Sequence, residues 1–166
     1  GGPGRWLFRK LLPRLQRFDR EAAARVDHFI ANSHFVAERI QRLYGRESAV
    51  IHPPVAIERF AAPDTLPEDF YLIVAELVSY KRVDLAIQAC AQTGRRLIVA
   101  GAGPEQTRLT AMAAATEGRV RLVGRVSDEE IVRLMRRCRA FLHPQIEDFG
   151  ISAVEAQAAG RPVIAL

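Results

Sequence analysis

Short apolar runs alternate with amphipathic segments of helical length along most of the chain. In the amphipathic segments, apolar residues recur every three or four positions, as at Val83, Ala86, Ile87 and Cys90. Strands separated by helices of this length form parallel sheets through crossover connections. The pattern therefore predicts an α/β fold, a Rossmann-like parallel sheet with helices on both faces. The apolar runs lie at residues 70–75, 97–100, 120–123, 140–142 and 162–166.

Turn chemistry predicts where several helices begin and end. The turn at residues 101–104 is glycine-rich, and we expect Pro104 at the first position of the next helix. Ser127 and Glu130 have the spacing of a capping box ahead of a helix. Gly160 is expected to end a helix over residues 151–159.

The first third of the chain has a similar but shorter pattern. We expect strands over residues 26–31 and 49–51, on either side of a helix that Ser33 caps and Gly45 ends. Residues 61–69 have the composition of a loop. The sequence therefore predicts a first segment over residues 1–60 and a second domain over residues 61–166.

Residues 1–25 are basic and helix-prone, and Pro13 is expected to interrupt the helix. One interpretation is a stripe that contacts a membrane surface, because apolar and basic side chains are interleaved. The other is a helix whose apolar face packs against a neighbouring domain. We favour the second, because a break at Pro13 leaves each apolar stripe short.

Composition narrows the class of protein. The 166 residues are 49% hydrophobic and 26% charged, which is typical of a globular domain. No apolar run approaches the ~20 residues of a membrane span, and two cysteines are too few for a disulfide framework. Lys10 and Lys81 are the only lysines among 24 basic residues, which draws attention to Lys81.

Two of the predicted loops after strands carry candidate anion-binding groups. Gly101 and Gly103 begin a dinucleotide fingerprint, but Gln106 stands at its third glycine position, so a plain tight turn explains them equally well. Lys81 and Arg82 precede a helix, where positive charge opposes the helix dipole. We expect Lys81 to face an anion such as phosphate, the alternative being a solvated surface pair.

A third loop carries carboxylates. Glu147 lies in the loop and Glu155 about one turn into the next helix, with Gly150 at the junction. Two carboxylates facing one pocket suit a ligand rich in hydroxyl groups. The alternative is that Glu147 and Asp148 are first-turn charges and Glu155 lies on the surface, and spacing alone favours this alternative.

At these residues the sequence resembles the retaining glycosyltransferases of family 4 (group 1), which have the GT-B architecture. The resemblance extends from about residue 19 to the C-terminus. It lies in a glutamate, seven residues, a second glutamate and an A-x-G-x-P-V tail, which correspond to residues 147–165, and in the motifs ANS (31–33), HPPV (52–55), LVSYKR (77–82), GAGPE (101–105) and GRVSDEE (124–130).

The resemblance implies a C-terminal domain that binds a nucleotide-diphosphate sugar, preceded in residues 1–60 by the tail of an N-terminal domain, with the chain cut at both ends. Lys81 would contact the diphosphate and Glu147 the donor hexose, and we take these two as the catalytic residues. The donor- and nucleotide-binding residues would be Gly101, Gly103, Gly124, Arg125, Val126, Phe149, Gly150, Ile151 and Glu155, with Glu155 on the ribose and residues 124–126 at the base.

The sequence departs from the family pattern in two respects. The family usually has Arg where this chain has Glu76, and a carboxylate there would repel a phosphate. The catalytic side chain of the N-terminal domain matches none of the four histidines, so we expect the isolated chain to be inactive. No Asp-x-Asp motif occurs, which fits an enzyme that needs no metal or other cofactor.

The expected function is transfer of a mannose- or glucose-type hexose from GDP-mannose or a UDP-hexose, with retention, to a carbohydrate or lipid-linked acceptor. We expect a cytoplasmic protein that could contact the cytoplasmic face of a membrane. Alternatives are an epimerase or phosphorylase of the same fold, or a basic module that binds RNA or a membrane surface. Nucleic acid is not expected as a partner, because arginine is spread along the chain and aromatic residues make up only 7%.

Overall fold

The computed structural model describes residues 3–61 and 65–166. The chain forms two compact units, residues 1–53 and residues 54–166, which are described separately. The assignment of residues 1–60 to the tail of a preceding domain stays a prediction. Residues 62–64 of the expected loop lie outside the described residues. Within the described parts of both units, no helix is long and apolar enough to cross a membrane.

The first unit consists of two helices and a two-stranded parallel sheet. Ser33 caps the second helix as predicted, its hydroxyl accepting a hydrogen bond from the Val36 N–H at 3.1 Å, and Gly45 ends that helix in the left-handed conformation (φ 66°). The first strand is shorter than predicted, three residues in place of six. The elements are α1 (Pro3–Ala24), β1 (Phe29–Ala31), α2 (His34–Tyr44) and β2 (Ser48–Val50).

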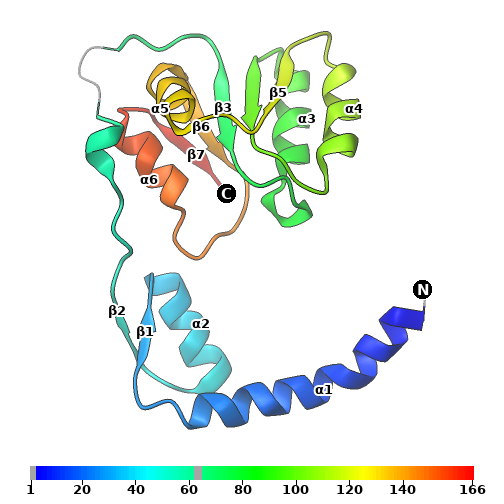
Figure 1. The fold of residues 1–166 in the computed structure, drawn as a ribbon, viewed down its shortest axis with the longest axis vertical. Helices are drawn as coiled ribbons and strands as arrows, with labels where there is room; N and C mark the ends of the chain where they lie inside the picture. The colour runs from blue at the N-terminus through cyan, green and yellow to red at the C-terminus, as the bar shows by residue number, and fades with distance from the viewer. Residues whose placement is uncertain (1–2, 62–64) are drawn as a thin grey trace. The chain divides into compact units, whose positions relative to one another are not determined.

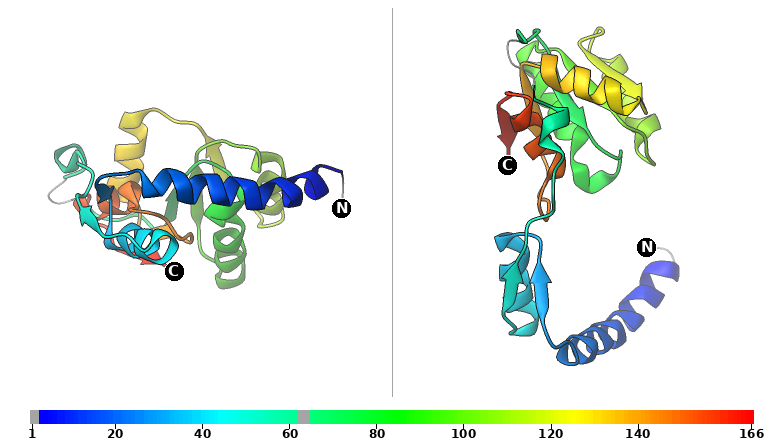
Figure 2. Two further views of the ribbon diagram at one scale, coloured as in Figure 1. Left: turned by 90° about the horizontal axis from the view of Figure 1, so that it is seen from below. Right: turned by 60° about the vertical axis from the view of Figure 1, so that its left-hand side comes forward.

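Helix α1 is continuous, so the prediction that Pro13 interrupts it was wrong (Figure 2). Pro13 removes the N–H that would bond to the Arg9 carbonyl, and its ring crowds that carbonyl. The 22-residue helix nevertheless continues on both sides of it. The apolar stripe of α1 is therefore not divided. The argument against membrane contact was that each apolar stripe is short, and the continuous helix removes that argument.

The second unit is a five-stranded parallel sheet with helices on both faces (Figure 1). Its strands are β3 (Tyr71–Val74), β4 (Leu97–Ala100), β5 (Val120–Gly124), β6 (Ala140–His143) and β7 (Val163–Ala165). Its helices are η1 (Ile57–Arg59), η2 (Ser79–Lys81), α3 (Val83–Thr93), α4 (Gln106–Ala114), α5 (Asp128–Arg137) and α6 (Ile151–Ala158).

The strand order β5-β4-β3-β6-β7 and the two-sided packing confirm the predicted fold class. Helices α3 and α4 bury their apolar side chains against one face, in a cluster that includes Ile87, Leu97 and Leu109. Helices α5 and α6 cover the other face, around Met135 and Phe141. The four residues at helical spacing in α3 are all buried, as the pattern predicted.

One predicted helix start differs from the structure, and one predicted capping box is only half formed. Helix α4 begins at Gln106, so Pro104 lies in the preceding turn and not at the first helical position. The hydroxyl of Ser127 accepts from the Glu130 N–H at 3.3 Å, but the Glu130 carboxylate pairs with Arg133. Local spacing thus predicted the Ser127 cap correctly. The Glu130 side chain does not complete the capping box, because it pairs with Arg133.

Candidate functional site

Two loops leave the centre of the five-stranded sheet, where the neighbouring strands β3 and β6 end. From β3 the chain continues to α3 on one face of the sheet, and from β6 it continues to α6 on the other. Open α/β sheets bind ligands beyond the carboxyl ends of their strands at such a reversal. Lys81 follows β3 and Glu147 follows β6, so the topology brings these two predicted site residues to one point.

Lys81 and Glu147 form an ion pair between the ammonium Nζ and the carboxylate Oε1. The lysine side chain is 13% exposed and the glutamate side chain 28% exposed, so solvent still reaches both charges. Burial lowers the pKa of Lys81, and the negative charge of Glu76 opposes this shift. The sequence-based alternative of a solvated surface pair therefore does not describe Lys81.

The backbone around Lys81 is a tight turn between two helices. The single turn η2 ends at Lys81, and Arg82 adopts the left-handed conformation with φ 51° before α3 begins. That conformation costs a residue with a side chain about 1 kcal/mol. The Arg82 guanidinium lies 3.6 Å from the Asp84 carboxylate in the first turn of α3. Lys81 and Arg82 thus have different partners, although they are adjacent in sequence.

The second oxygen of Glu147 faces two polar side chains of the same loop. The Gln145 amide Nε2 donates to Glu147 Oε2 at 3.1 Å, and His143 Nε2 lies 3.4 Å from the same oxygen. Both His143 and Gln145 are buried. Burial lowers the pKa of His143, and the positive charge of Lys81 lowers it further. The Glu147 carboxylate is therefore held from both sides.

Gly150 connects this loop to α6 in the left-handed conformation, with φ 84°. A Cβ added there would lie 3.4 Å from His143 Nε2, so the glycine packs closely on the imidazole. Phe149 and Ile151 flank it at the start of α6. The first amide groups of a helix have no acceptor within the helix, which makes this position suitable for an anionic ligand.

Gly101 and Gly103 have a packing requirement of their own. A Cβ on Gly101 would lie 1.8 Å from the Ala75 carbonyl oxygen, and one on Gly103 would lie 2.5 Å from the Leu77 oxygen. The loop after β4 also bonds to the loop after β3, with Leu77 N–H donating to the Ala102 oxygen at 3.0 Å. These glycines therefore support the loop that carries Lys81, and a direct contact with a ligand stays a prediction.

Residues 124–126 leave strand β5 beside this loop. The Gly124 carbonyl accepts from the Gly101 N–H at 2.7 Å, where the pairing of β4 and β5 shifts register. Arg125 is exposed and Val126 packs against the core under α5. The prediction that this segment meets a nucleobase is neither supported nor contradicted by these contacts.

Glu155 lies in α6 close to two charges, and no sequence motif connects them with it. Burial raises the pKa of Glu155, the positive charge of Arg59 opposes this shift, and the negative charge of Asp128 adds to it. Arg59 and Asp128 pair with each other at 3.2 Å. Glu155 is thus a half-buried carboxylate at the edge of an ion pair, which is compatible with accepting hydrogen bonds from ligand hydroxyls.

A family profile described as "Glycosyl transferases group 1" matches residues 54–166, which is more than half of the chain. The chain belongs to the group 1 glycosyltransferase family. The resemblance in the sequence motifs is thereby confirmed.

Named relatives agree with this assignment. The chain is 32% identical to D-rhamnosyltransferase WbpZ of Pseudomonas aeruginosa, over 95% of this chain and 44% of the relative. It is 30% identical to D-inositol 3-phosphate glycosyltransferase of Mycobacterium bovis, over 89% of this chain and 35% of the relative. The chain thus spans less than half the length of these relatives.

Solved structures show the same fold. TarM of S. aureus superposes with a TM-score of 0.77 at 20% identity, over 91% of this chain and 32% of TarM. HepE of Anabaena, crystallised with UDP and glucose, gives a TM-score of 0.75 at 23% identity, over 90% of this chain and 47% of HepE. At these identities the likeness establishes the architecture that group 1 glycosyltransferases share.

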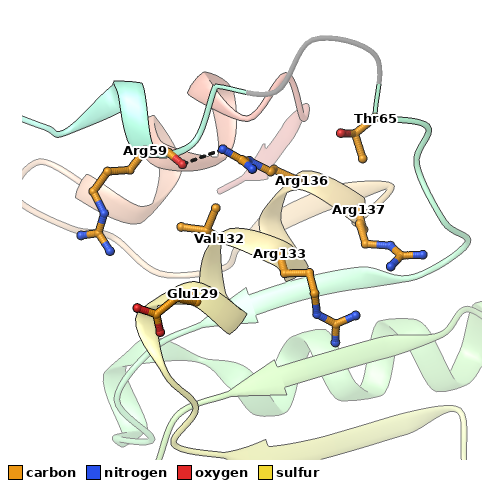
Figure 3. Close-up of a pocket in the computed structure, with 7 residues that line it drawn as sticks. All are labelled: Arg59, Thr65, Glu129, Val132, Arg133, Arg136 and Arg137. Carbon is orange, nitrogen blue, oxygen red and sulfur yellow. Dashed lines mark hydrogen bonds between the residues drawn. The ribbon is translucent and has the colours of Figure 1, made fainter.

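A separate groove of about 580 Å³ lies along α5 (Figure 3). Four arginines line it, and all four are engaged: Arg59 pairs with Asp128, Arg133 with Glu130 and Arg137 with Glu68. Arg136 donates to the Arg59 and Ala61 carbonyl oxygens, both at 2.9 Å. In this group 1 glycosyltransferase, Arg59, Arg136 and Arg137 thus join η1 and the following loop to α5, Arg133 pairs within α5, and we do not place the ligand there.

Three residues of the site have no individual role that the sequence motifs identify. They are His143, Gln145 and Arg59. A polar residue directly after an apolar strand is the signal that could have identified His143 and Gln145. No local signal identifies Arg59, because it approaches Glu155 only through the fold.

Proposed function

We propose that this chain is the donor-binding part of a metal-independent, retaining glycosyltransferase that takes a hexose from a nucleotide-diphosphate sugar. The observation that carries the proposal is the Lys81–Glu147 ion pair at the centre of the sheet, where strands β3 and β6 end. It supplies a positive charge for the diphosphate and a carboxylate for sugar hydroxyls at one place.

The chemistry follows from these charges. When the bond from the sugar to the diphosphate breaks, negative charge builds on the diphosphate oxygens, and a fixed ammonium group stabilises that charge. Lys81 would exchange its contact with Glu147 for the diphosphate. Glu147 would then accept hydrogen bonds from the hexose, while the start of α6 at residues 149–151 would face the adjacent phosphate.

The remaining predicted contacts complete the nucleotide site. Glu155 would accept from the ribose hydroxyls, and residues 124–126 would lie at the base. The donor is proposed as GDP-mannose or a UDP-hexose, and the acceptor as a carbohydrate or lipid-linked hydroxyl. The UDP-hexose alternative is supported by HepE, which was crystallised with UDP and glucose. Family membership favours a transferase over the epimerase or phosphorylase alternative.

Ligand-induced stabilisation tests the proposal directly. We expect GDP, UDP or ADP, or one of their sugars, at millimolar concentration to raise the melting temperature of the chain, because a ligand that binds only the folded state stabilises it. Lys81→Met should abolish the increase. Lys10→Met is a matched control, because Lys10 is the only other lysine and lies over the Trp6 ring in α1. The absence of any increase in the unsubstituted chain would overturn the proposal.

We also propose that the acceptor site lies in an N-terminal domain. The isolated chain should therefore bind the donor weakly and transfer no sugar. Detectable transfer by the 166-residue chain would contradict this part of the proposal.

We also propose that α1 contacts the anionic cytoplasmic surface of a membrane. Its apolar side chains recur every three or four residues and are at least two-fifths exposed at Leu7, Leu11, Leu15 and Phe18. Basic residues occupy much of the rest of the helix surface, which suits an interfacial helix. They are Arg9, Lys10, Arg14, Arg17 and Arg20.

A further inference from the structure

Two buried polar side chains lie directly behind Glu147. Gln145 is 6% exposed and His143 is 8% exposed. Polar groups are rarely buried without a partner, because losing hydrogen bonds to water is costly. The Gln145 amide nitrogen and the His143 ring contact each other and the Glu147 carboxylate. The Gln145 amide oxygen is buried and has no hydrogen-bond partner among the described residues.

The pattern of donors and acceptors defines the protonation of this group. The Gln145 amide nitrogen lies 3.3 Å from His143 Nδ1 and 3.1 Å from Glu147 Oε2. An amide NH2 has two hydrogens to donate, so Nδ1 of a neutral imidazole accepts one of them. The imidazole proton then lies on Nε2, which faces Glu147 Oε2. With the Gln145 amide in the opposite orientation, its oxygen would face the Glu147 carboxylate. Repulsion between these oxygens excludes that orientation.

We propose that Gln145 and His143 are positioning residues that fix Glu147 Oε2, so that Oε1 alone is free to exchange Lys81 for a hydroxyl of the donor sugar. The inference rests on the proposed function, because it assigns a purpose to the site described above. Gly150 lies beside the same arrangement, since a Cβ there would be within 3.4 Å of His143 Nε2.

If Glu147 is positioned in this way, its loss should affect binding of the sugar and binding of the phosphates differently. Glu147 would hold the hexose and Lys81 the diphosphate. Loosening Glu147 should therefore weaken binding of a nucleotide sugar much more than binding of the nucleotide diphosphate alone. The ratio of the two dissociation constants measures the contribution of the sugar, and a general loss of structure would lower both affinities together.

The experiment compares UDP with UDP-glucose, and GDP with GDP-mannose, by calorimetry on the 166-residue chain. Gln145→Met removes the amide donors and keeps the side-chain length. His143→Phe keeps the ring shape without an N–H, whereas His143→Gln restores a neutral donor near the position of Nε2. Gln157→Met is the matched control, because Gln157 is an exposed glutamine of α6 that donates only to the Ala153 oxygen.

We expect Gln145→Met to lower the preference for the nucleotide sugar over the diphosphate about tenfold and His143→Phe about threefold, since a hydrogen bond to a charged group is being lost. His143→Gln and Gln157→Met should leave the preference within about twofold of the unsubstituted chain.

Two results would overturn the inference while the proposed function stands: an unchanged preference in Gln145→Met, or a proportional loss of both ligands. Failure of the unsubstituted chain to bind either nucleotide would instead overturn the proposed function.

Discussion

At the scale of single residues, Glu76 stands where the motif resemblance leads us to expect an arginine. Its carboxylate is exposed on the loop that carries Lys81, and its charge acts on that lysine. We expect Glu76→Arg to raise the affinity for a nucleoside diphosphate about fivefold, because a repulsive charge becomes an attractive one. An exposed charge contributes at most about 1 kcal/mol. Calorimetric titration with UDP and GDP measures the change.

The control for Glu76→Arg is Glu38→Arg, an exposed position in α2 that changes the net charge equally. Equal gains in both variants would show that overall charge, and not the position of Glu76, governs binding.

His143 predicts a pH dependence of stability. Its pKa is lowered in the folded chain, so the unfolded chain takes up a proton first as pH falls through about 6.5. The contribution of the neutral imidazole to stability is therefore present above that pH, and it decreases between 6.5 and the lower folded-state pKa. We expect urea unfolding at about pH 7.5 and about pH 5.5 to show a smaller loss of stability in His143→Gln than in the unsubstituted chain.

His34→Gln, at an exposed histidine of α2, should not reproduce that effect. An identical loss of stability in His143→Gln and the unsubstituted chain would be incompatible with a buried neutral imidazole.

At the scale of elements, the sequence predicted most of the second unit. Residues 97–100 form a strand with the predicted bounds, and the predicted face of α3 is buried, because periodicity and burial are local properties of the chain. The errors at Pro104 and Pro13 concern where a helix starts or stops. There the outcome depends on competing hydrogen bonds, such as the one from the Glu105 N–H to the Leu77 oxygen at 2.9 Å, which come from the fold.

The close approach of the loops after β3 and β4 predicts a large effect of a small substitution. Gly103→Ala would place a Cβ 2.5 Å from the Leu77 oxygen, and we expect it to destabilise the chain by about 3 kcal/mol through overpacking. Gly94→Ala is the control, since Gly94 has φ 66° but open space around it. It should cost only about 1 kcal/mol of backbone strain. Urea unfolding curves measure both, and equal costs would argue against the close contact.

Helix α1 predicts binding to anionic lipid. We expect the chain to float with vesicles that contain phosphatidylserine and to be released by salt, because basic side chains add to apolar burial. Leu15→Asp, on the apolar stripe, should weaken binding more than tenfold, since a buried leucine contributes about 2 kcal/mol. Gln16→Asp introduces the same charge one position away and should weaken it much less. Flotation that is equally sensitive to both variants, or insensitive to lipid charge, would contradict a role for the stripe.

At the scale of the whole molecule, the central contact of the site could not be predicted from the sequence. Lys81 and Glu147 are far apart in the chain, and they meet only because β3 pairs with β6. Local patterns predict strands and helices but not the order of strands in a sheet. The resemblance to the family identified Lys81 and Glu147 as site residues, but it did not predict that they contact each other. The pairing of Glu147 with Gln145 and His143 depends on side-chain geometry that no motif encodes.

The distribution of the proposed contacts predicts where a ligand protects the chain. All proposed donor contacts lie in residues 54–166, on the loops after β3, β5 and β6 and in α6. Hydrogen exchange with saturating nucleotide sugar should therefore slow in peptides that cover residues 76–82, 124–126 and 144–151, because binding suppresses local opening of these loops. Peptides from α1 should be unaffected, and the Lys81→Met chain should show no protection. Protection confined to α1, or centred on the arginine groove along α5, would place the ligand elsewhere and contradict the proposed site.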